Sequence, residues 1–398
     1  MAADSPTTNR LSSSIGRITT TGTVNYYAGT ISGPWGIVAG PDGALWFTNL
    51  ADDSIGRIST AGTVTSYTGT GINRPVGIAV GPDGALWFTN EGNSSIGRIT
   101  TAGKVTNYDD PSIVTPFAIV AGPDGALWFT DYGDFSIGRI TAAGKVTKYT
   151  DPSISVPYGI VAGPDGALWF TNQGLGSSSI GRITTAGKVT SYTDPKISAP
   201  GGIAVGPDGA LWFTLGVGLS SPAIGRITTT GTVTRYTDPN ISGPTEIAAG
   251  PDGALWFTNG ENSIGRISTT GTVTNYTDPR IVYPGAHGIA AGPDGAVWFT
   301  NDTFNVGGNG SIGRITAVAS TPVIVPGTAT IAEGNSGTRT LNVPVALSRV
   351  SALPVTVQWA TTNHTATAPS DYTAASGTVT FAPGQTTKTV PITVNGDT

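Results

Sequence analysis

One nine-residue segment dominates the sequence: G-P-D-G-A-L-W-F-T recurs seven times, with a single substitution, Val297, in the last copy. The first glycines of the copies lie 41 to 44 residues apart, from Gly40 to Gly292. A fixed period of this size indicates one supersecondary unit that is repeated around a ring or along a stack. The repeat also aligns the chain with itself, so constant positions can be separated from variable ones.

A single period predicts four antiparallel strands joined by tight turns. P-D-G and T-A-G are turn sequences in which glycine accepts a positive φ, and β-prone runs flank them. In the fourth copy the predicted strands are 159–162, 167–171, 180–184 and 188–192. Four strands per period make a β-propeller blade, and closing the ring removes exposed sheet edges. We therefore predict an all-β chain with a seven-bladed propeller over residues 11–318.

The last period is incomplete, which predicts how the ring closes. After a third strand at Ile312–Ile315 the chain runs into A-S-T-P, with no fourth strand. Thr23–Tyr27 has the pattern of the missing strand, so we expect it to pair beside Ile312–Ile315. The N-terminal segment also carries Ile15–Ile18, which brings the copies of I-G-R-I to eight for seven blades. The sequence alone does not show which copy is surplus.

Residues that every copy keeps are interpreted as architecture. The aspartate of P-D-G favours the hairpin turn, and the tryptophan lies in the middle of an apolar strand, as expected for packing between blades. One arginine per I-G-R-I favours pairing with turn carbonyls or aspartates. Ligand, aromatic-array and anion-binding roles for these sets are the weaker alternatives.

Variable positions gather on the face opposite the P-D-G turns, where binding residues are expected on a rigid scaffold. The position five residues before each G-P-D-G is occupied by Trp35, Val76, Phe117, Tyr158, Gly201, Thr245 and His287. The next position is glycine or alanine except at Glu246. The residue after W-F-T is Asn49, Asn90, Asp131, Asn172, Leu215, Asn259 and Asn301. We predict that these residues line a half-aromatic, half-polar mouth that binds a small molecule, peptide or glycan. The alternative is a water-filled channel without a ligand.

Composition excludes several classes of function. The net charge is −5 and only 11% of residues are charged, which argues against a nucleic-acid partner. There is no cysteine, and no apolar run approaches the roughly 20 residues of a membrane span. The chain starts without an apolar signal core. Its low charge and many threonines favour a secreted or bacterial surface protein, with a cytoplasmic one as the alternative.

The segments G-P-D-G-A-L-W-F-T-N, S-I-G-R-I-T-T-A-G and H-G-I-A-A-G-P-D-G resemble the virginiamycin B (streptogramin) lyase family over about residues 11–318. Members are seven-bladed propellers that open a cyclic depsipeptide by Mg²⁺-assisted elimination, with a histidine as general base. The resemblance implies that His287, in the H-G-I segment, corresponds to this base.

Three other positions depart from the family pattern. Gly285 and Asn301 stand where the family has glutamates, and Thr245 stands where it has a second histidine. Because Mg²⁺ prefers carboxylate oxygens, these changes predict little or no lyase activity. Glu246, one blade away from His287, is the candidate replacement carboxylate. Magnesium is therefore expected only if the chain is an active lyase.

Residues 321–398 resemble a Calx-β domain, an immunoglobulin-like sandwich common in bacterial surface proteins. The resemblance rests on I-A-E-G-N-S-G-T, D-Y-T, S-G-T-V-T-F and P-G-Q, and the chain ends before the family's last two strands. Glu333, Asp371 and Asp397 match family calcium positions, although three carboxylates are an incomplete set for calcium. The alternative is a structural spacer without metal.

These observations favour an extracellular ligand-binding propeller without efficient lyase activity, followed by a Calx-β spacer. One alternative is a Mg²⁺-dependent carbon–oxygen lyase that uses His287 as base. Another is a structural surface or filament protein that self-associates when its incomplete sandwich accepts a strand from a neighbour.

Overall fold

The computed structural model describes residues 16–18, 25–27, 30–174, 178–216, 221–260, 263–278, 281, 288–301, 311–315, 324–347, 355–381 and 385–396. The chain divides after residue 317 into two compact units. Neighbouring strands in the described sheets are antiparallel, except that β1 (Gly16–Ile18) is parallel to β29 (Ser311–Ile315). Within the described ranges, no helix is long and apolar enough to cross a membrane.

Six sheets of the first unit have four strands each, ordered along the chain from the innermost to the outermost strand. Sheet one contains β3 (Pro34–Ala39), β4 (Leu45–Asn49), β5 (Ser54–Ile58) and β6 (Val64–Thr68). Sheet two contains β7 (Pro75–Val80), β8 (Leu86–Asn90), β9 (Ser95–Ile99) and β10 (Val105–Asp109). Sheet three contains β11 (Pro116–Ala121), β12 (Leu127–Asp131), β13 (Ser136–Ile140) and β14 (Val146–Tyr149).

The next three sheets repeat this pattern. Sheet four contains β15 (Pro157–Ala162), β16 (Leu168–Asn172), β17 (Ser179–Ile183) and β18 (Val189–Tyr192). Sheet five contains β19 (Pro200–Val205), β20 (Leu211–Leu215), β21 (Ala223–Ile227) and β22 (Val233–Tyr236). Sheet six contains β23 (Ile247–Ala249), β24 (Leu255–Asn259), β25 (Ser263–Ile267) and β26 (Val273–Thr277).

The seventh sheet joins the two ends of the ring. It contains β27 (Ile289–Ala291), β28 (Val297–Asn301), β29 (Ser311–Ile315), β2 (Asn25–Tyr26) and β1 (Gly16–Ile18). β2 is antiparallel to β29, with Asn25 opposite Arg314, which confirms the predicted N-terminal closing strand. β1 pairs with β2 and also lies parallel to β29, so the surplus copy of I-G-R-I is the N-terminal one.

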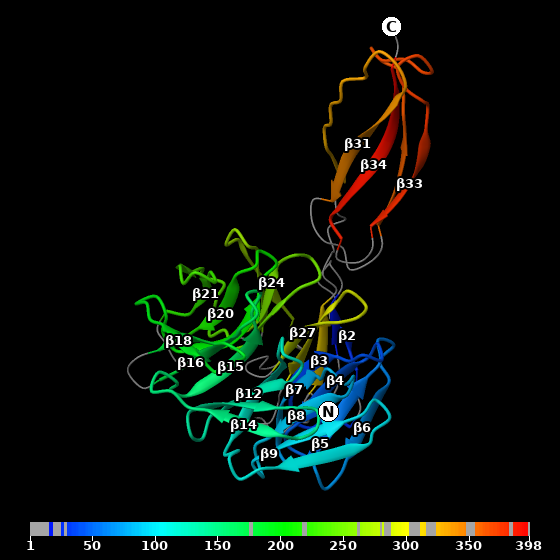
Figure 1. Cartoon of the computed structure of the whole chain (residues 1–398). Helices are drawn as coiled ribbons and strands as arrows, with labels where there is room; N and C mark the ends of the chain where they lie inside the picture. Colours follow the sequence, from blue (N-terminus) through cyan, green and yellow to red (C-terminus); the bar gives the residue numbers. More distant parts are fainter. Residues whose placement is uncertain are drawn as a thin grey trace, which may run out of the picture. The chain divides into compact units, whose positions relative to one another are not determined.

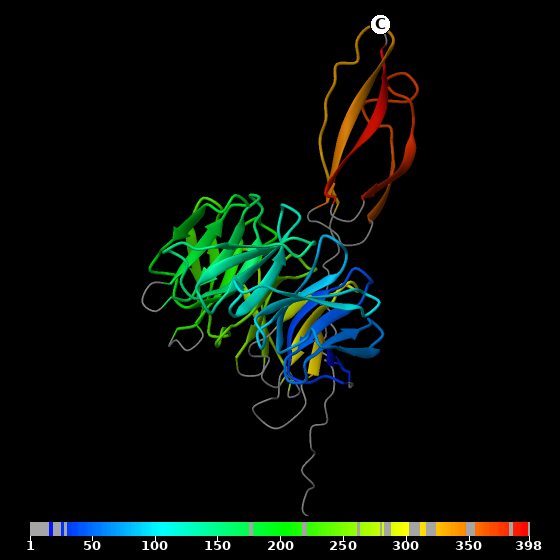
Figure 2. The same ribbon diagram turned by 60° about the horizontal axis from the view of Figure 1, so that its bottom comes forward.

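Contacts between innermost strands run around the whole ring and return from β27 to β3. Figure 1 shows β27 beside β3, and Figure 2 shows the same neighbours after a turn of 60°. Each apolar core cluster combines residues of two adjacent sheets; in one, Trp298 of the last sheet packs with Ile37 and Phe47 of the first. The tryptophans therefore pack between blades, as predicted.

The P-D-G aspartates hold these tryptophans in place. In the first sheet, Trp46 Nε1 donates to Asp42 Oδ1 over 3.0 Å, and Arg57 Nε donates to Asp42 Oδ2 over 2.6 Å. The Arg57 guanidinium also lies 6.0 Å from the centre of the Trp46 ring. The same carboxylate pairing recurs in sheets two to five, at Asp83, Asp124, Asp165 and Asp208. The architectural interpretation of the aspartates and arginines is thus confirmed for these sheets.

The second unit is also made of strands. One sheet contains β30 (Ile324–Pro326), β31 (Thr338–Leu347) and β34 (Thr387–Asn395), and the other contains β32 (Val355–Ala360) and β33 (Ser376–Phe381). Its strands alternate in burial, as expected for a sandwich with one packed face per sheet. Among its described residues, the buried apolar side chains are Leu347, Tyr372, Phe381 and Val390.

Candidate functional site

A β-bulge opens the innermost strand of each of the first five sheets. In the first sheet, Pro34 pairs with Asn49 and Ile37 pairs with Phe47, so Trp35 and Gly36 together face one partner residue. The same shift occurs before Ile78, Ile119, Ile160 and Ile203. Bulges re-aim side chains, and here they re-aim the residue that varies most between the repeats.

In the first four blades, the threonine of W-F-T fixes the bulge and links it to the next blade. Thr48 Oγ1 accepts a hydrogen bond from Gly36 N over 2.9 Å and donates to Val76 O over 2.8 Å. Thr300 donates to Trp35 O over 3.0 Å, which extends this link from the last blade to the first. This role was not predicted, although an invariant polar residue in the middle of an apolar strand indicates a specific partner.

These bulges surround a cavity of about 160 Å³ that is lined by the innermost strands. Of the predicted site residues, its wall contains Trp35, Val76, Phe117, Tyr158 and Glu246. Three of these side chains form a continuous aromatic cluster. The ring centroids of Phe117 and Tyr158 lie 4.5 Å apart, and those of Trp35 and Phe117 lie 6.2 Å apart in an edge-on arrangement.

Glu246 brings a carboxyl group to this apolar wall. Its backbone N–H donates to Thr258 Oγ1 over 2.9 Å, as the equivalent residue does in each of the first four blades. A Cβ added to Gly202 would lie only 2.4 Å from Glu246 Oε2. The glycine of the preceding blade therefore leaves the space that the carboxyl group occupies.

The surroundings of Glu246 favour its neutral form. The side chain is half-buried because it faces the cavity. Burial raises the pKa of Glu246 to about 8, since the charged form loses hydration. The pKa of Tyr158 is raised as well, first by burial and then by the nearby Glu246 charge. The cavity therefore contains an acid that can change its charge near neutral pH.

The residues after W-F-T do not line this cavity, so the prediction that they line the mouth is wrong. Asn172 shows why: its Oδ1 accepts from Ser155 N, and its Nδ2 donates to Ser153 O and to Ser179 Oγ. The buried side-chain amide thus fixes the loop that precedes the innermost strand of the blade. All seven members of this set are buried: Asn49, Asn90, Asp131, Asn172, Leu215, Asn259 and Asn301. Thr245, whose hydroxyl lies 2.7 Å from Thr258 Oγ1, is not a lining residue either.

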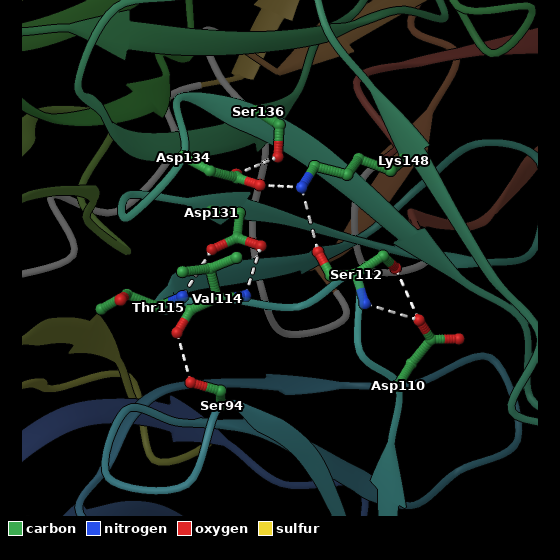
Figure 3. A network of polar contacts seen from close by, with 9 residues as sticks. All are labelled: Ser94, Asp110, Ser112, Val114, Thr115, Asp131, Asp134, Ser136 and Lys148. Carbon is green, nitrogen blue, oxygen red and sulfur yellow. Dashed lines mark hydrogen bonds and ion pairs between the residues drawn. The ribbon is translucent and has the colours of Figure 1, made fainter.

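Two blades stabilise the equivalent loop with different residues. In blade three, Asp131 accepts from Val114 N and Thr115 N, and Lys148 Nζ donates to Ser112 O in place of an amide (Figure 3). In blade five, Leu215 and Ala223 replace the asparagine–serine pair and join the apolar core. Variation at this position therefore reflects alternative packing solutions.

The residues that are present do not fit the family's magnesium site. Asn301 is a buried amide and Thr245 a hydrogen-bonded hydroxyl, so neither offers the carboxylate that Mg²⁺ prefers. His287 and Gly285 lie outside the described residues, although the adjacent Gly288 lines the cavity. Among the described residues, no three acidic, histidine or cysteine side chains gather as a metal site.

In the second unit, Glu333 and Asp371 line one cavity of about 780 Å³. Asp371 Oδ2 accepts from Thr367 N over 2.7 Å, so part of its carboxylate capacity is used by its own loop. Asp397 lies outside the described residues. Calcium binding by this set stays a prediction.

The fold and cavity define the first unit as a seven-bladed β-propeller with a chemically mixed central pocket. The family model for the virginiamycin B lyase family matches residues 6–112 and 68–321, and the Calx-beta domain model matches residues 326–398. The chain therefore belongs to the virginiamycin B lyase family and carries a Calx-β domain.

Solved structures agree with this assignment. A streptogramin B lyase is 36% identical, with a TM-score of 0.64, over 72% of this chain and 94% of that one. A catalytically inactive variant of virginiamycin B lyase from Staphylococcus aureus, solved with quinupristin, is 33% identical with a TM-score of 0.64, over 73% and 97%. The WD40 propeller of Doa1 shares the fold at 14% identity and a TM-score of 0.57, over 73% and 95%. No curated protein matches the chain.

Proposed function

We propose that this protein binds a small organic ligand in the propeller cavity and has no efficient lyase activity. The observation that carries the proposal is the wall itself. Three aromatic side chains and one carboxyl group converge on a cavity of about 160 Å³. Apolar walls with a few placed polar groups are typical of ligand sites.

The residues around the cavity support binding rather than elimination. A metal-assisted elimination needs a Lewis acid to stabilise the developing negative charge. Thr245 and Asn301 offer no carboxylate to such a metal, and Gly285 has no side chain. A lone histidine base typically contributes only about 10²–10⁴-fold, so His287 alone would leave any elimination slow.

The direct test combines turnover and binding. The full chain is incubated with quinupristin and Mg²⁺, and mass spectrometry follows the linear product, with an active family lyase as positive control. We expect no turnover above background, together with ligands from a small-molecule screen that raise the Tm and lose this effect in Phe117→Ala. Rapid turnover that both a chelator and His287→Ala abolish would overturn the proposal.

A second candidate function is the lyase reaction itself. It is favoured by the 36% identity to a streptogramin B lyase and by Glu246, a carboxyl group on the cavity wall. In this version His287 is the base and Glu246 replaces a lost carboxylate. Turnover that needs both residues would support it, and turnover that survives Glu246→Gln would reject the replacement role.

A further inference from the structure

The three rings on the cavity wall come from blades one, three and four and line one space. Trp35 is on β3, Phe117 on β11 and Tyr158 on β15, and all three line the cavity. Aromatic faces attract cations through the ring quadrupole, most strongly where water is excluded. A neutral guest would use only the apolar character of this wall.

Among the described residues that line the cavity, the one acid is Glu246 of blade six, on the other side of blade five from Tyr158. Between Tyr158 and Glu246 the intervening blade has two glycines, Gly201 and Gly202, so no side chain separates the carboxyl group from the space. Glu246 Oε2 lies against Gly202, and its charge influences Tyr158. A guest between the rings and Glu246 therefore contacts both.

We propose that the cavity binds a small alkylammonium cation, with its charged head between the Trp35, Phe117 and Tyr158 rings and the Glu246 carboxylate. This inference rests on the proposed ligand-binding function and names the ligand class. A cavity near 150 Å³ accepts a guest the size of benzene, so this one suits a compact head group such as trimethylammonium. An anion would be repelled by ionised Glu246.

Cation binding must be linked to a proton at Glu246. In the free protein this acid is largely neutral at pH 7, and a bound cation favours its ionised form. Among the described residues that face it, β15 contributes the Tyr158 hydroxyl and β19 contributes Gly202, which has no titratable group. His287, which precedes β27, lies outside the described residues. Binding should therefore strengthen as pH rises through about 8.

The experiment uses two probes of equal shape and different charge. Choline carries a permanent positive charge, and 3,3-dimethylbutan-1-ol is its neutral isostere, so neither probe titrates. We expect titration calorimetry on the full chain to show choline binding at least about tenfold more tightly than the alcohol at pH 9. Choline affinity should also rise about tenfold from pH 7 to pH 9, with proton release at pH 7.

Variants locate the effect. Glu246→Gln should remove the preference for choline and the pH dependence, and Glu246→Ala restores a residue that the other blades tolerate at this position. Glu91→Gln removes an acid that pairs with Arg74 outside the cavity, and it should leave both properties unchanged. Thermal unfolding checks that each variant is folded.

The outcomes separate this inference from the function on which it rests. Equal binding of the two probes, or choline binding that persists in a folded Glu246→Gln, would overturn the cation site but leave a ligand-binding cavity. Binding of neither probe would overturn the cation site as well, and the small-molecule screen then decides the proposed function by itself.

Discussion

The two ends of the same propeller strands contrast sharply. At the P-D-G end, five blades repeat one arrangement in which an aspartate joins a tryptophan and an arginine, with Trp–Asp distances of 2.9 to 3.0 Å. At the bulge end, a threonine accepts from the bulge N–H in each of the first four blades, so the backbone there is regular too, but the side chains differ from blade to blade. Trp128 belongs to the P-D-G arrangement, and Trp35 lies at a bulge.

The difference shows how one repeat separates stability from recognition. Residues that close the interface between blades are identical because each interface has the same shape. At the bulges, Trp35, Val76, Phe117 and Tyr158 line the cavity, so their identity is not fixed by the constant interface between blades. Sequence variation inside a repeat therefore points to function only where the backbone turns the side chain out of the core.

The largest difference in stability should appear when a tryptophan at each end of the strands is replaced by alanine. Trp128 is fully buried, donates to Asp124 over 3.0 Å and stacks on Tyr149. Trp128→Ala should lower the free energy of unfolding by about 3–5 kcal/mol, because it leaves a large cavity. Trp35→Ala should cost less than about 1 kcal/mol but weaken ligand binding. Urea unfolding of both variants tests this, and similar losses would break the contrast.

A smaller effect is expected where an amide fixes the blade-entry loop. Asn172→Leu removes the amide that donates to Ser153 O and accepts from Ser155 N. Because both backbone groups lose their partner, the free energy of unfolding should fall by about 1–3 kcal/mol. Adding Ser179→Ala reproduces the Leu215–Ala223 pair of blade five and should recover part of the loss. A double-mutant cycle measured by thermal unfolding would show no coupling if the two positions act independently.

The carboxyl groups of the two ends should respond to pH in opposite directions. At Asp165, burial alone would raise the pKa, but the hydrogen bonds from Trp169 and Arg182 outweigh it and hold the pKa below 3.8. Its contribution is complete above pH 3.8 and is lost as pH falls through the lower folded-state pKa. Asp42, Asp83, Asp124 and Asp208 share this behaviour.

Glu246 has the opposite sign, because its folded-state pKa of about 8 exceeds the ordinary value of 4.5. Its unfavourable contribution grows as pH rises from 4.5 to 8 and then stays constant. Glu246→Gln should therefore raise the Tm relative to the parent protein more at pH 9 than at pH 5. Asp165→Asn should have a lower Tm than the parent near neutral pH, and this difference in Tm should become smaller as pH falls below 3.8. Parallel pH profiles for the two variants would contradict this assignment.

The smallest effect should arise in blade three. Lys148 donates to Ser112 O over 3.1 Å and pairs with Asp134. Lys148→Met should cost about 0.5–1.5 kcal/mol, mostly the net value of the hydrogen bond, because a partly exposed ion pair adds little. In Asp131→Asn the new amide can donate to the same carbonyl, and Lys148→Met should then cost less. An unchanged cost in that background, measured by urea unfolding, would show that Lys148 acts in another way.

Most of the fold could be predicted from the sequence because the same pattern of strands and turns is repeated seven times. The period, the turn residues and the missing fourth strand predicted the blades and the N-terminal closure that β2 makes with β29. Of the residues predicted at the channel mouth, Trp35, Val76, Phe117, Tyr158 and Glu246 line one cavity, whereas Thr245 does not. The prediction failed for Asn172 and its equivalents, because a polar residue at a strand end has the same pattern whether it faces a cavity or braces a buried loop.

What the sequence determined by itself is the architecture, since hydrophobic period and turn chemistry are local properties that each repeat specifies alone. What only the tertiary structure decided is which variable residues share a space. Trp35 and Tyr158 are 123 positions apart in the chain, yet both reach one cavity because bulges in different blades turn them toward the ring's axis. The raised pKa of Glu246 also depends on the tertiary structure, because its burial and the space left by Gly202 are set by residues of other blades.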